Sequence, residues 1–539
     1  MMFIAACVAI LLPLILLALF KLSAKYSMAI TALVVIVVAI TLWHMFPAAV
    51  LASSLQGAHR ALTVIWILIG AITLLYTVQN TKAVARIRQG FMAISEDMRV
   101  QVVIVGFAFL SLIEGASGFG TPAVVVAPLL IALGFRPIVA ASIALISDTV
   151  ACTFGAVGTP LVVGLENVSV YSSDLVTEVA KVITTLDLVI GTMLPFALIY
   201  VLVMWFGHGK RSEKWANVRA MAPWSLMVGA TYSLTAFVSV RVLGVEFAAI
   251  IAGSVALVVS VITARRKFLL RNLSYWRDEA EHEAELALRE KVPNSQQSSM
   301  SLIQAWSPYI LIVIFLLVSR TVPTVKDFLL NSLDLSWLSI LGFETINSAW
   351  PILYSPGTIL LLAAMLGSYI QSRSLRPAGA AFVNGLRTAA ISAFALIPTL
   401  IMVQVFTNSG NNSAGIEAMP IYIGEVLARF SGEAWLIFSP LLGSLGAFIA
   451  GSATVSSLTM ASVQESVALS SGLPVVLVLA MQVLGAVAGN IIAIHNVVAA
   501  AAVVGLAHRE GIIIRRVLPA TVVYIAVVVV LGLVYLLLT

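Results

Sequence analysis

The sequence predicts an all-α polytopic membrane protein with about 12 transmembrane helices and two opposed re-entrant hairpins, arranged as an inverted repeat. Three observations support this fold class. Of the 539 residues, 61% are hydrophobic and only 10% are charged, and the mean hydropathy is +1.07. Many apolar runs exceed the roughly 18 residues that mark a candidate spanning helix. Finally, short basic loops separate these runs, and glycine-rich breaks interrupt four of them.

The apolar runs divide into single spans and two longer segments. The segments 101–134 and 434–471 are too long and too often broken to be single spans, so we expect each to form a hairpin. Single spans are expected near 2–20, 27–44, 61–79, 138–164, 181–206, 221–242, 244–264, 302–320, 357–371, 386–407, 474–507 and 517–538.

The four breaks occur two to each half of the chain. The first half contains Glu114-Gly-Ala-Ser-Gly-Phe-Gly-Thr-Pro122 and Thr153-Phe-Gly-Ala-Val-Gly-Thr-Pro160, and the second contains Ala450-Gly-Ser-Ala-Thr-Val-Ser-Ser457 and the stretch 485–496. Irregular backbone at membrane depth is tolerated only where protein or a watery cavity satisfies its polar groups. Paired breaks at corresponding places in two halves therefore indicate the binding site of a secondary transporter.

Basic loops predict the orientation, because Lys and Arg concentrate on the cytoplasmic side. All of them share one side only if both termini lie outside the cell and each hairpin enters and leaves by the same face. We therefore expect a multi-pass protein of the cell (inner) membrane. The residues that mark the cytoplasmic side are Lys82, Arg86, Arg88, Arg99, Lys210, Arg211, Lys214, Arg219, Arg265, Arg266, Lys267, Arg271, Arg373, Arg376, Arg509, Arg515 and Arg516.

This topology divides the chain into three parts. Residues 1–206 form the first repeat half and residues 302–539 the second. Residues 207–301 supply linking helices and a cytoplasmic amphipathic linker. Each break lies about 15 to 18 residues from the membrane surface, or roughly 23–27 Å along a helix, so all four breaks can meet near the middle of the bilayer.

The breaks offer groups that could hold an anion. Thr121-Pro122 and Thr159-Pro160 are typical of an N-cap followed by proline at the first helical position, and helix starts attract negative charge. Because the spans contain almost no Lys or Arg at this depth, the pattern favours a small hydroxylated monocarboxylate over a di- or tricarboxylate. The alternative is that the small residues only allow close helix packing. The candidate substrate-binding residues are Ser117, Gly118, Gly120, Thr121, Thr159, Gly451, Ser452, Ser456 and Asn490.

Ionisable residues inside a membrane are functional candidates by default. Glu114, Asp148 and His495 are the candidates for proton coupling, because such groups can exchange a proton with water. Their alternative roles are structural. Glu114 would accept hydrogen bonds from hairpin N–H groups, Asp148 would form a helix–helix hydrogen bond and His495 would make an ordinary polar contact. Asp187 and Glu465 are expected nearer the outer interface, in contact with water.

Other function classes lack support. The two cysteines, Cys7 and Cys152, exclude a cysteine-based metal cluster, and no cofactor is expected. The net charge of +6 comes from loops between spans rather than from a nucleic-acid footprint. No nucleotide-binding or hydrolase motif is present, so the chain is not expected to be an enzyme.

Several motifs resemble the L-lactate permease family of bacterial lactate and glycolate importers. In the first half these are Leu112-Ile-Glu-Gly-Ala-Ser-Gly-Phe-Gly-Thr-Pro122, Leu130-Ile-Ala-Leu-Gly-Phe135 and Phe154-Gly-Ala-Val-Gly158. The resemblance implies proton symport of a small 2-hydroxymonocarboxylate such as L-lactate, glycolate or D-lactate. It also marks the hairpin residues from Glu114 to Thr121 as site candidates. Further matches are Ala305-Trp-Ser-Pro308, Ser439-Pro-Leu-Leu-Gly443, Gly451-Ser452 and Val503-Val-Gly-Leu506.

The chain departs from the family pattern at four positions. Ala453 stands where the family usually has an acidic residue, Asn490 where it has lysine, Gln304 where it has arginine and Asp148 where it tends to have asparagine. These departures keep open a sodium-coupled transporter of another small organic anion. A further alternative, of another class, is a membrane sensor that binds a ligand without transport. The sequence does not set the oligomeric state.

Overall fold

The computed structural model describes residues 2–16, 20, 22, 24–118, 120–166, 168–169, 171–270, 276, 300–431 and 434–539. Within these ranges the chain is helical, with three isolated β-bridges. Eight of the described helices are long and apolar enough to cross a membrane, or up to ten if each of two bent pairs counts as one span. The expected number of about 12 is not reached by this criterion, because the apolar helices Met2–Pro13 and Lys25–Thr41 are shorter than 18 residues.

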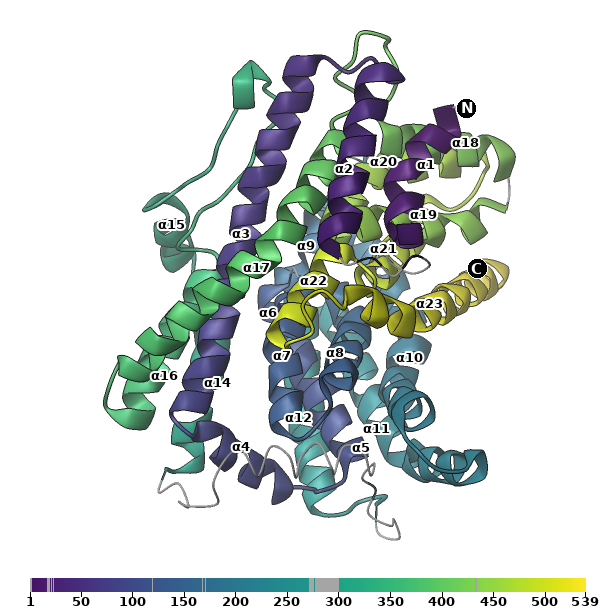
Figure 1. Ribbon diagram of the computed structural model, residues 1–539. Helices are drawn as coiled ribbons and strands as arrows, with labels where there is room; N and C mark the ends of the chain where they lie inside the picture. The colour runs from purple at the N-terminus through teal and green to yellow at the C-terminus, as the bar shows by residue number, and fades with distance from the viewer. Residues whose placement is uncertain are drawn as a thin grey trace.

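The first of two helix bundles contains helices from both halves of the chain (Figure 1). Helices α3 and α17 run along each other, and Gly57 allows their close approach, since a Cβ there would lie 2.5 Å from the Ile401 Cα. The five helices of this bundle are α2 (Ala24–Thr41), α3 (Pro47–Asn80), α14 (Leu302–Thr321), α16 (Pro356–Ser372) and α17 (Arg376–Thr407).

The second bundle contains all four segments that the sequence analysis identified as broken. Its members from the first half and the link are α5 (Met98–Gln101), η2 (Val102–Phe109), α6 (Leu110–Ser117), α7 (Thr121–Ala132), α8 (Pro137–Cys152), α9 (Gly155–Val162), α10 (Ser173–Tyr200), η3 (Val201–Phe206), α11 (Arg211–Val242), η4 (Val245–Phe247) and α12 (Ala248–Arg265). Its members from the second half are α19 (Trp435–Ala450), α20 (Ala453–Ser470), α21 (Val475–Asn490), α22 (Ile494–Val503) and α23 (Glu510–Leu538).

The remaining described helices connect or flank the two bundles. They are α1 (Met2–Leu14), α4 (Ala83–Met92), α15 (Pro323–Asn331), η5 (Ile340–Gly342) and α18 (Met419–Ser431). Most of the expected cytoplasmic amphipathic linker within 207–301 lies outside the described residues.

Helices α8 and α21 form the interior of the second bundle. Every residue from Val139 to Cys152 and from Leu477 to Asn490 is buried. Each of these helices ends at a break and continues in a short helix, α9 or α22. Because neighbouring helices shield both breaks from lipid, their irregular backbone can be satisfied by protein groups.

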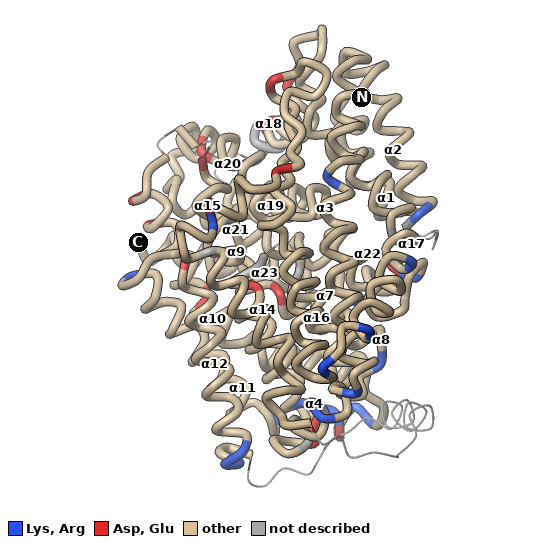
Figure 2. The backbone as a smooth tube through the Cα atoms, turned by 90° about the vertical axis from the view of Figure 1, so that its left-hand side faces the viewer, with Lys and Arg blue, Asp and Glu red and all other residues tan. Residues whose placement is uncertain are grey.

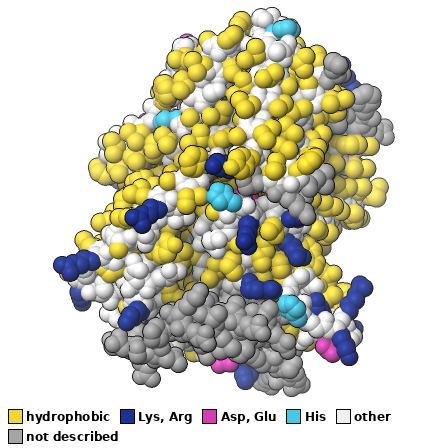
Figure 3. All heavy atoms as spheres, viewed as in Figure 1, with side chains coloured by type: hydrophobic (Ala, Val, Ile, Leu, Met, Phe, Trp, Pro, Cys, Tyr) yellow, Lys and Arg dark blue, Asp and Glu magenta, His cyan; other side chains and the backbone are white. Residues whose placement is uncertain are grey.

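Charge is distributed unevenly along the molecule. Many Lys and Arg residues lie in the lower half of Figure 2, around α4 and below α11. The face drawn in Figure 3 is largely hydrophobic in its upper half, with basic side chains concentrated below. This segregation agrees with the grouping of basic loops on one side that the sequence predicts.

Candidate functional site

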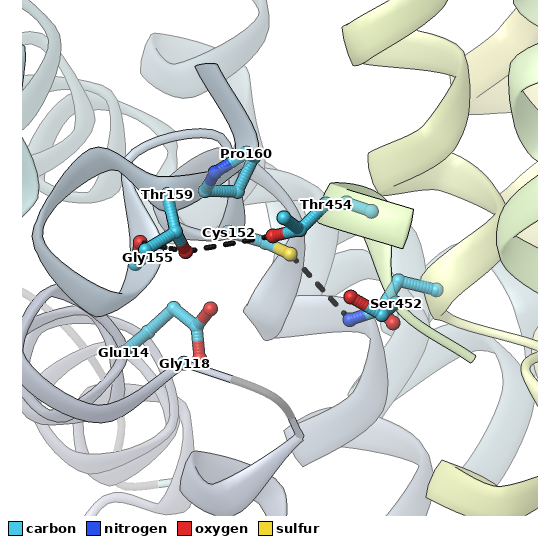
Figure 4. A pocket seen from close by; sticks show the side chains of 10 residues that line it. Glu114, Gly118, Cys152, Gly155, Thr159, Pro160, Ser452 and Thr454 are labelled. Atoms are coloured by element: carbon cyan, nitrogen blue, oxygen red, sulfur yellow. Dashed lines mark hydrogen bonds between the residues drawn. The ribbon is translucent and has the colours of Figure 1, made fainter. Parts of the chain in front are cut away.

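The four breaks meet around one small cavity inside the second bundle (Figure 4). Its free volume is about 10 Å³, room for about one water molecule. None of the lining residues is Lys or Arg, as the sequence predicts for this depth. The lining residues are Glu114, Gly118, Cys152, Gly155, Thr159, Pro160, Ser452, Ala453, Thr454 and Asn490.

The first break joins α6 to α7. Gly118 and Gly120 have φ values of +60° and +72°, which glycine adopts without the steric cost of a Cβ. The N–H of Gly118 donates to the Glu114 carbonyl at 3.0 Å and so ends α6. Ser117 is the last residue of α6 and Thr121 the first of α7. The N-cap position therefore belongs to Gly120, and the prediction that Thr121 is the N-cap was wrong by one residue.

The second break separates α8 from α9, whose axes differ by 59°. Ala156, Val157 and Gly158 have φ values of +46°, +61° and +79°. For the two residues with a Cβ, this left-handed backbone costs about 1–2 kcal/mol each. Thr159 follows this turn, but its hydroxyl donates to the Gly155 carbonyl at 3.4 Å. The side-chain N-cap predicted for Thr159 is therefore absent, because the turn directs its hydroxyl back toward Gly155.

The third break lies between α19 and α20. Gly451, with φ +64°, ends α19, and the Ser452 hydroxyl caps α20 by accepting from the Val455 N–H at 3.4 Å. Ser456 lies one turn farther and does not line the cavity. Its hydroxyl donates to the Gly443 carbonyl at 2.7 Å and so ties α20 to α19.

The fourth break separates α21 from α22. Asn490 ends α21, and the Asn496 amide donates to its side-chain oxygen at 2.7 Å. The Asn490 amide in turn lies 3.5 Å from the sulfur of Cys152 on α8. This chain of side chains connects the broken spans of the two halves of the sequence.

The tips of the α6–α7 and α19–α20 turns both press against the start of α22. A Cβ on Gly120 would overlap the Asn496 side chain, and one on Gly451 would overlap the imidazole of His495. His495 is 9% exposed and does not line the cavity. Both tips therefore need glycine for close approach as well as for backbone conformation.

Two carboxyl groups meet beside the cavity. Glu114 on α6 and Asp148 on α8 lie within hydrogen-bonding reach of each other, and the Cys152 thiol is next to Glu114. Both carboxyl groups are buried, and one oxygen of each, Glu114 Oε2 and Asp148 Oδ1, has no hydrogen-bond partner among the described residues. Two of the three predicted coupling candidates therefore form a pair, and His495 stands apart from them.

The structure corrects the prediction that Asp187 and Glu465 contact water. Both are buried, at 2% and 5% exposure. Glu465 accepts hydrogen bonds from the N–H and the hydroxyl of Ser169, at 2.8 and 2.7 Å.

Cys152 lines the cavity but was not predicted as a site residue. Its position at the end of α8, directly before a break, was a usable signal in the sequence.

Comparisons with known proteins identify the family. The L-lactate permease family profile matches residues 2–538. A putative L-lactate permease of Haemophilus influenzae is 30% identical over 79% of this chain and 77% of its own length. The L-lactate permease of Bacillus subtilis is 26% identical over 89% of this chain and 86% of its own length. The glycolate permease of Escherichia coli is 25% identical over 95% of this chain and 91% of its own length. No solved structure is significantly similar. The chain is therefore a multi-pass membrane protein that belongs to the L-lactate permease family.

Proposed function

We propose that this chain is a secondary transporter that imports a small 2-hydroxymonocarboxylate, L-lactate or glycolate, together with a proton. Membership of the L-lactate permease family and the printed functions of its lactate and glycolate relatives support this substrate class. The single observation that carries the proposal for this chain is that the cavity between the four breaks is lined both by helix starts with hydroxyls and by a buried carboxyl group.

One side of the cavity suits an anion. Thr159 and Pro160 begin the right-handed part of α9, and Ser452, Ala453 and Thr454 begin α20. Helix starts present free N–H groups and the positive end of the helix dipole. The substrate carboxylate docks between these two starts, where the threonine hydroxyls can donate to it. The absence of Lys and Arg from the lining favours a single carboxylate.

Other residues of the lining suit a proton. Glu114 and Cys152 line the cavity, and Asp148 is paired with Glu114. Two adjacent carboxyl groups shielded from water can share a proton and titrate as a pair. Glu114 carries the proton that accompanies the substrate, and Asp148 is its positioning partner. The Asn490 amide also lines the cavity and can meet the 2-hydroxyl group of the substrate.

The size of the cavity supports alternating access. About 10 Å³ is too little for a hydroxy acid, so the helices around it must separate to admit substrate. Every lining residue belongs to the second bundle. This bundle moves against the α3–α17 bundle during transport, an assignment that rests on analogy with other transporters. The segments 101–134 and 434–471 act as opposed re-entrant hairpins of an inverted repeat, 1–206 against 302–539, with both termini outside the cell.

The test is uptake of labelled L-lactate and glycolate into proteoliposomes that carry an imposed inward proton gradient, with and without sodium. Accumulation driven by the proton gradient alone is the expected result. Uptake that requires sodium would replace proton coupling with the sodium alternative. Binding without accumulation under either gradient would leave a ligand sensor.

A further inference from the structure

A third buried carboxyl group lies in the second bundle, outside the cavity. Asp187 is in the middle of α10, 2% exposed, about 21 Å along the helix from Ser173. Neither of its carboxyl oxygens has a hydrogen-bond partner among the described residues. A buried carboxyl group without a partner is costly, and at membrane depth it is a functional candidate.

Buried hydroxyl groups on two other helices belong to residues that interact with Asp187. Tyr232 on α11 and Tyr524 on α23 both interact electrostatically with it. Both rings are buried, and neither hydroxyl makes a hydrogen bond within the described chain. Ser233, next to Tyr232, has an equally unpartnered hydroxyl. A carboxyl group and several hydroxyls therefore share one buried region that has unused donors and acceptors.

This cluster extends to the cavity. Tyr232 interacts electrostatically with Glu114 and lies near Ser111, whose hydroxyl also makes no hydrogen bond among the described residues. Ser111 and Glu114 are three residues apart on α6, hence on one face of the helix. The Tyr232 ring is fixed by an edge contact with Phe107, with ring centroids 5.2 Å apart. Tyr232 is therefore the residue that interacts with both Glu114 and Asp187.

We propose that Asp187 is a second proton-carrying residue of the transport unit, which exchanges a proton with Glu114 when movement of the helices brings the hydroxyls of Ser111 and Tyr232 into one hydrogen-bonded line. The inference rests on the proposed proton symport. A hydroxyl both donates and accepts, so each one passes its own proton onward and receives one from the preceding group. The step moves one proton between two carboxyl groups and changes no other bond.

The charged and titratable groups around Asp187 fit this role. Tyr232 on α11 and Tyr524 on α23 interact with it. Tyr524 also interacts with Cys152 of α8, and Tyr232 with Glu114, which is paired with Asp148. A turn before Asp187, the Arg241 guanidinium donates to the Thr184 hydroxyl at 3.1 Å and lies 3.3 Å from the centre of the Phe237 ring. The described residues place no ion pair on Asp187.

The test compares two modes of transport in proteoliposomes. Exchange of internal for external lactate needs no net proton movement, whereas accumulation driven by a proton gradient does. Asp187→Asn keeps the shape of the side chain but cannot release a proton. We expect exchange to stay within about twofold of wild type and proton-driven accumulation to fall by at least about tenfold. Asp174→Asn, at the exposed start of α10, is the matched control.

Tyr232→Phe removes only a hydroxyl and gives an independent reading, with Tyr200→Phe on α10 as its control. The same split between exchange and accumulation is expected for Tyr232→Phe.

Wild-type accumulation by both Asp187→Asn and Tyr232→Phe would overturn the relay while leaving the proposed symport intact. Equal loss of exchange and accumulation would make Asp187 structural. A variant that loses only a dependence on sodium would make it a cation ligand. A wild-type protein without proton-driven accumulation would overturn the proposed function and this inference together.

Discussion

Thr159 of α9 and Thr454 of α20 place their hydroxyl oxygens 3.4 Å apart, across 295 residues of sequence. One belongs to the broken span of the first half and the other to the hairpin of the second. Both line the cavity, so the region that we propose for the substrate carboxylate exists only where the two halves meet. Each half alone would carry only part of it.

Removing either hydroxyl should weaken substrate binding. Thr159→Val and Thr454→Val keep the side-chain shape but remove one donor each. Loss of a hydrogen bond to a charged group costs about 1.5–3 kcal/mol, which corresponds to a rise in KM of roughly 10- to 150-fold. Initial rates of lactate uptake over a concentration series measure this change. Thr177→Val, at an exposed position of α10, is the control. An unchanged KM in both cavity variants would show that the substrate carboxylate does not bind between Thr159 and Thr454.

Removing the acidic proton of Glu114 should abolish uphill uptake but leave lactate exchange intact. Glu114→Gln keeps the size of the side chain and cannot release a proton, so the substrate would move without its coupled proton. We expect lactate exchange to persist while accumulation under a proton gradient disappears. The exposed Glu178, paired with Lys181 at 2.8 Å, supplies the control Glu178→Gln. Full accumulation by Glu114→Gln would refute its role as the coupling acid.

The tip of the second hairpin should tolerate no side chain. At Gly451, alanine adds about 1–2 kcal/mol of backbone strain and also overlaps the imidazole of His495. Gly472 has nearly the same φ, +67°, but a Cβ there meets nothing within 4 Å. Gly472→Ala therefore carries the strain alone. We expect Gly451→Ala to lose transport at normal expression, and Gly472→Ala to keep it. Similar activity of the two variants would show that the contact with His495 does not matter.

The ion pair at the start of α5 should matter for stability. The Arg99 side chain is fully buried, and its guanidinium donates to both oxygens of Asp97, at 2.9 Å from Nε and 2.5 Å from Nη2. Asp97 also accepts from the Arg99 backbone N–H and so caps α5. Asp97→Ala removes the carboxylate that this buried guanidinium contacts, and breaking a buried ion pair in this way costs about 3–5 kcal/mol. Thermal denaturation in detergent measures the loss, and a melting temperature equal to wild type would contradict it. Breaking the exposed Glu178–Lys181 pair should cost less than about 1 kcal/mol.

The sequence predicts the backbone of the site well, because the breaks depend on local chemistry. Gly118, Gly120, Gly158 and Gly451 all have positive φ, a conformation that favours glycine. The left-handed turn at Ala156 and Val157 was not predictable, since neither residue type favours it. That turn also explains why the predicted cap at Thr159 failed.

Side-chain partnerships required the tertiary structure. Glu114 and Asp148 lie on different helices, and neither their pairing nor the position of Cys152 beside them follows from spacing along the chain. Asp187 was expected near water because its depth was judged from the ends of its own span. Its burial depends instead on the helices packed around α10, including α11 and α23. Glu465 was misjudged for the same reason, since its partner Ser169 is 296 residues away.

The most direct test of the substrate site uses its own cysteine. The chain contains only Cys7 and Cys152, and Cys152 lines the cavity. In a Cys7→Ser variant, a small thiol reagent can reach Cys152 only when the cavity opens. The measurement is the labelling rate with increasing lactate, with Cys152→Ser as the blank and sulfate as the control anion. We expect lactate to slow labelling, with half-protection near its transport KM. A labelling rate unchanged by saturating lactate would show that Cys152 does not line the substrate site.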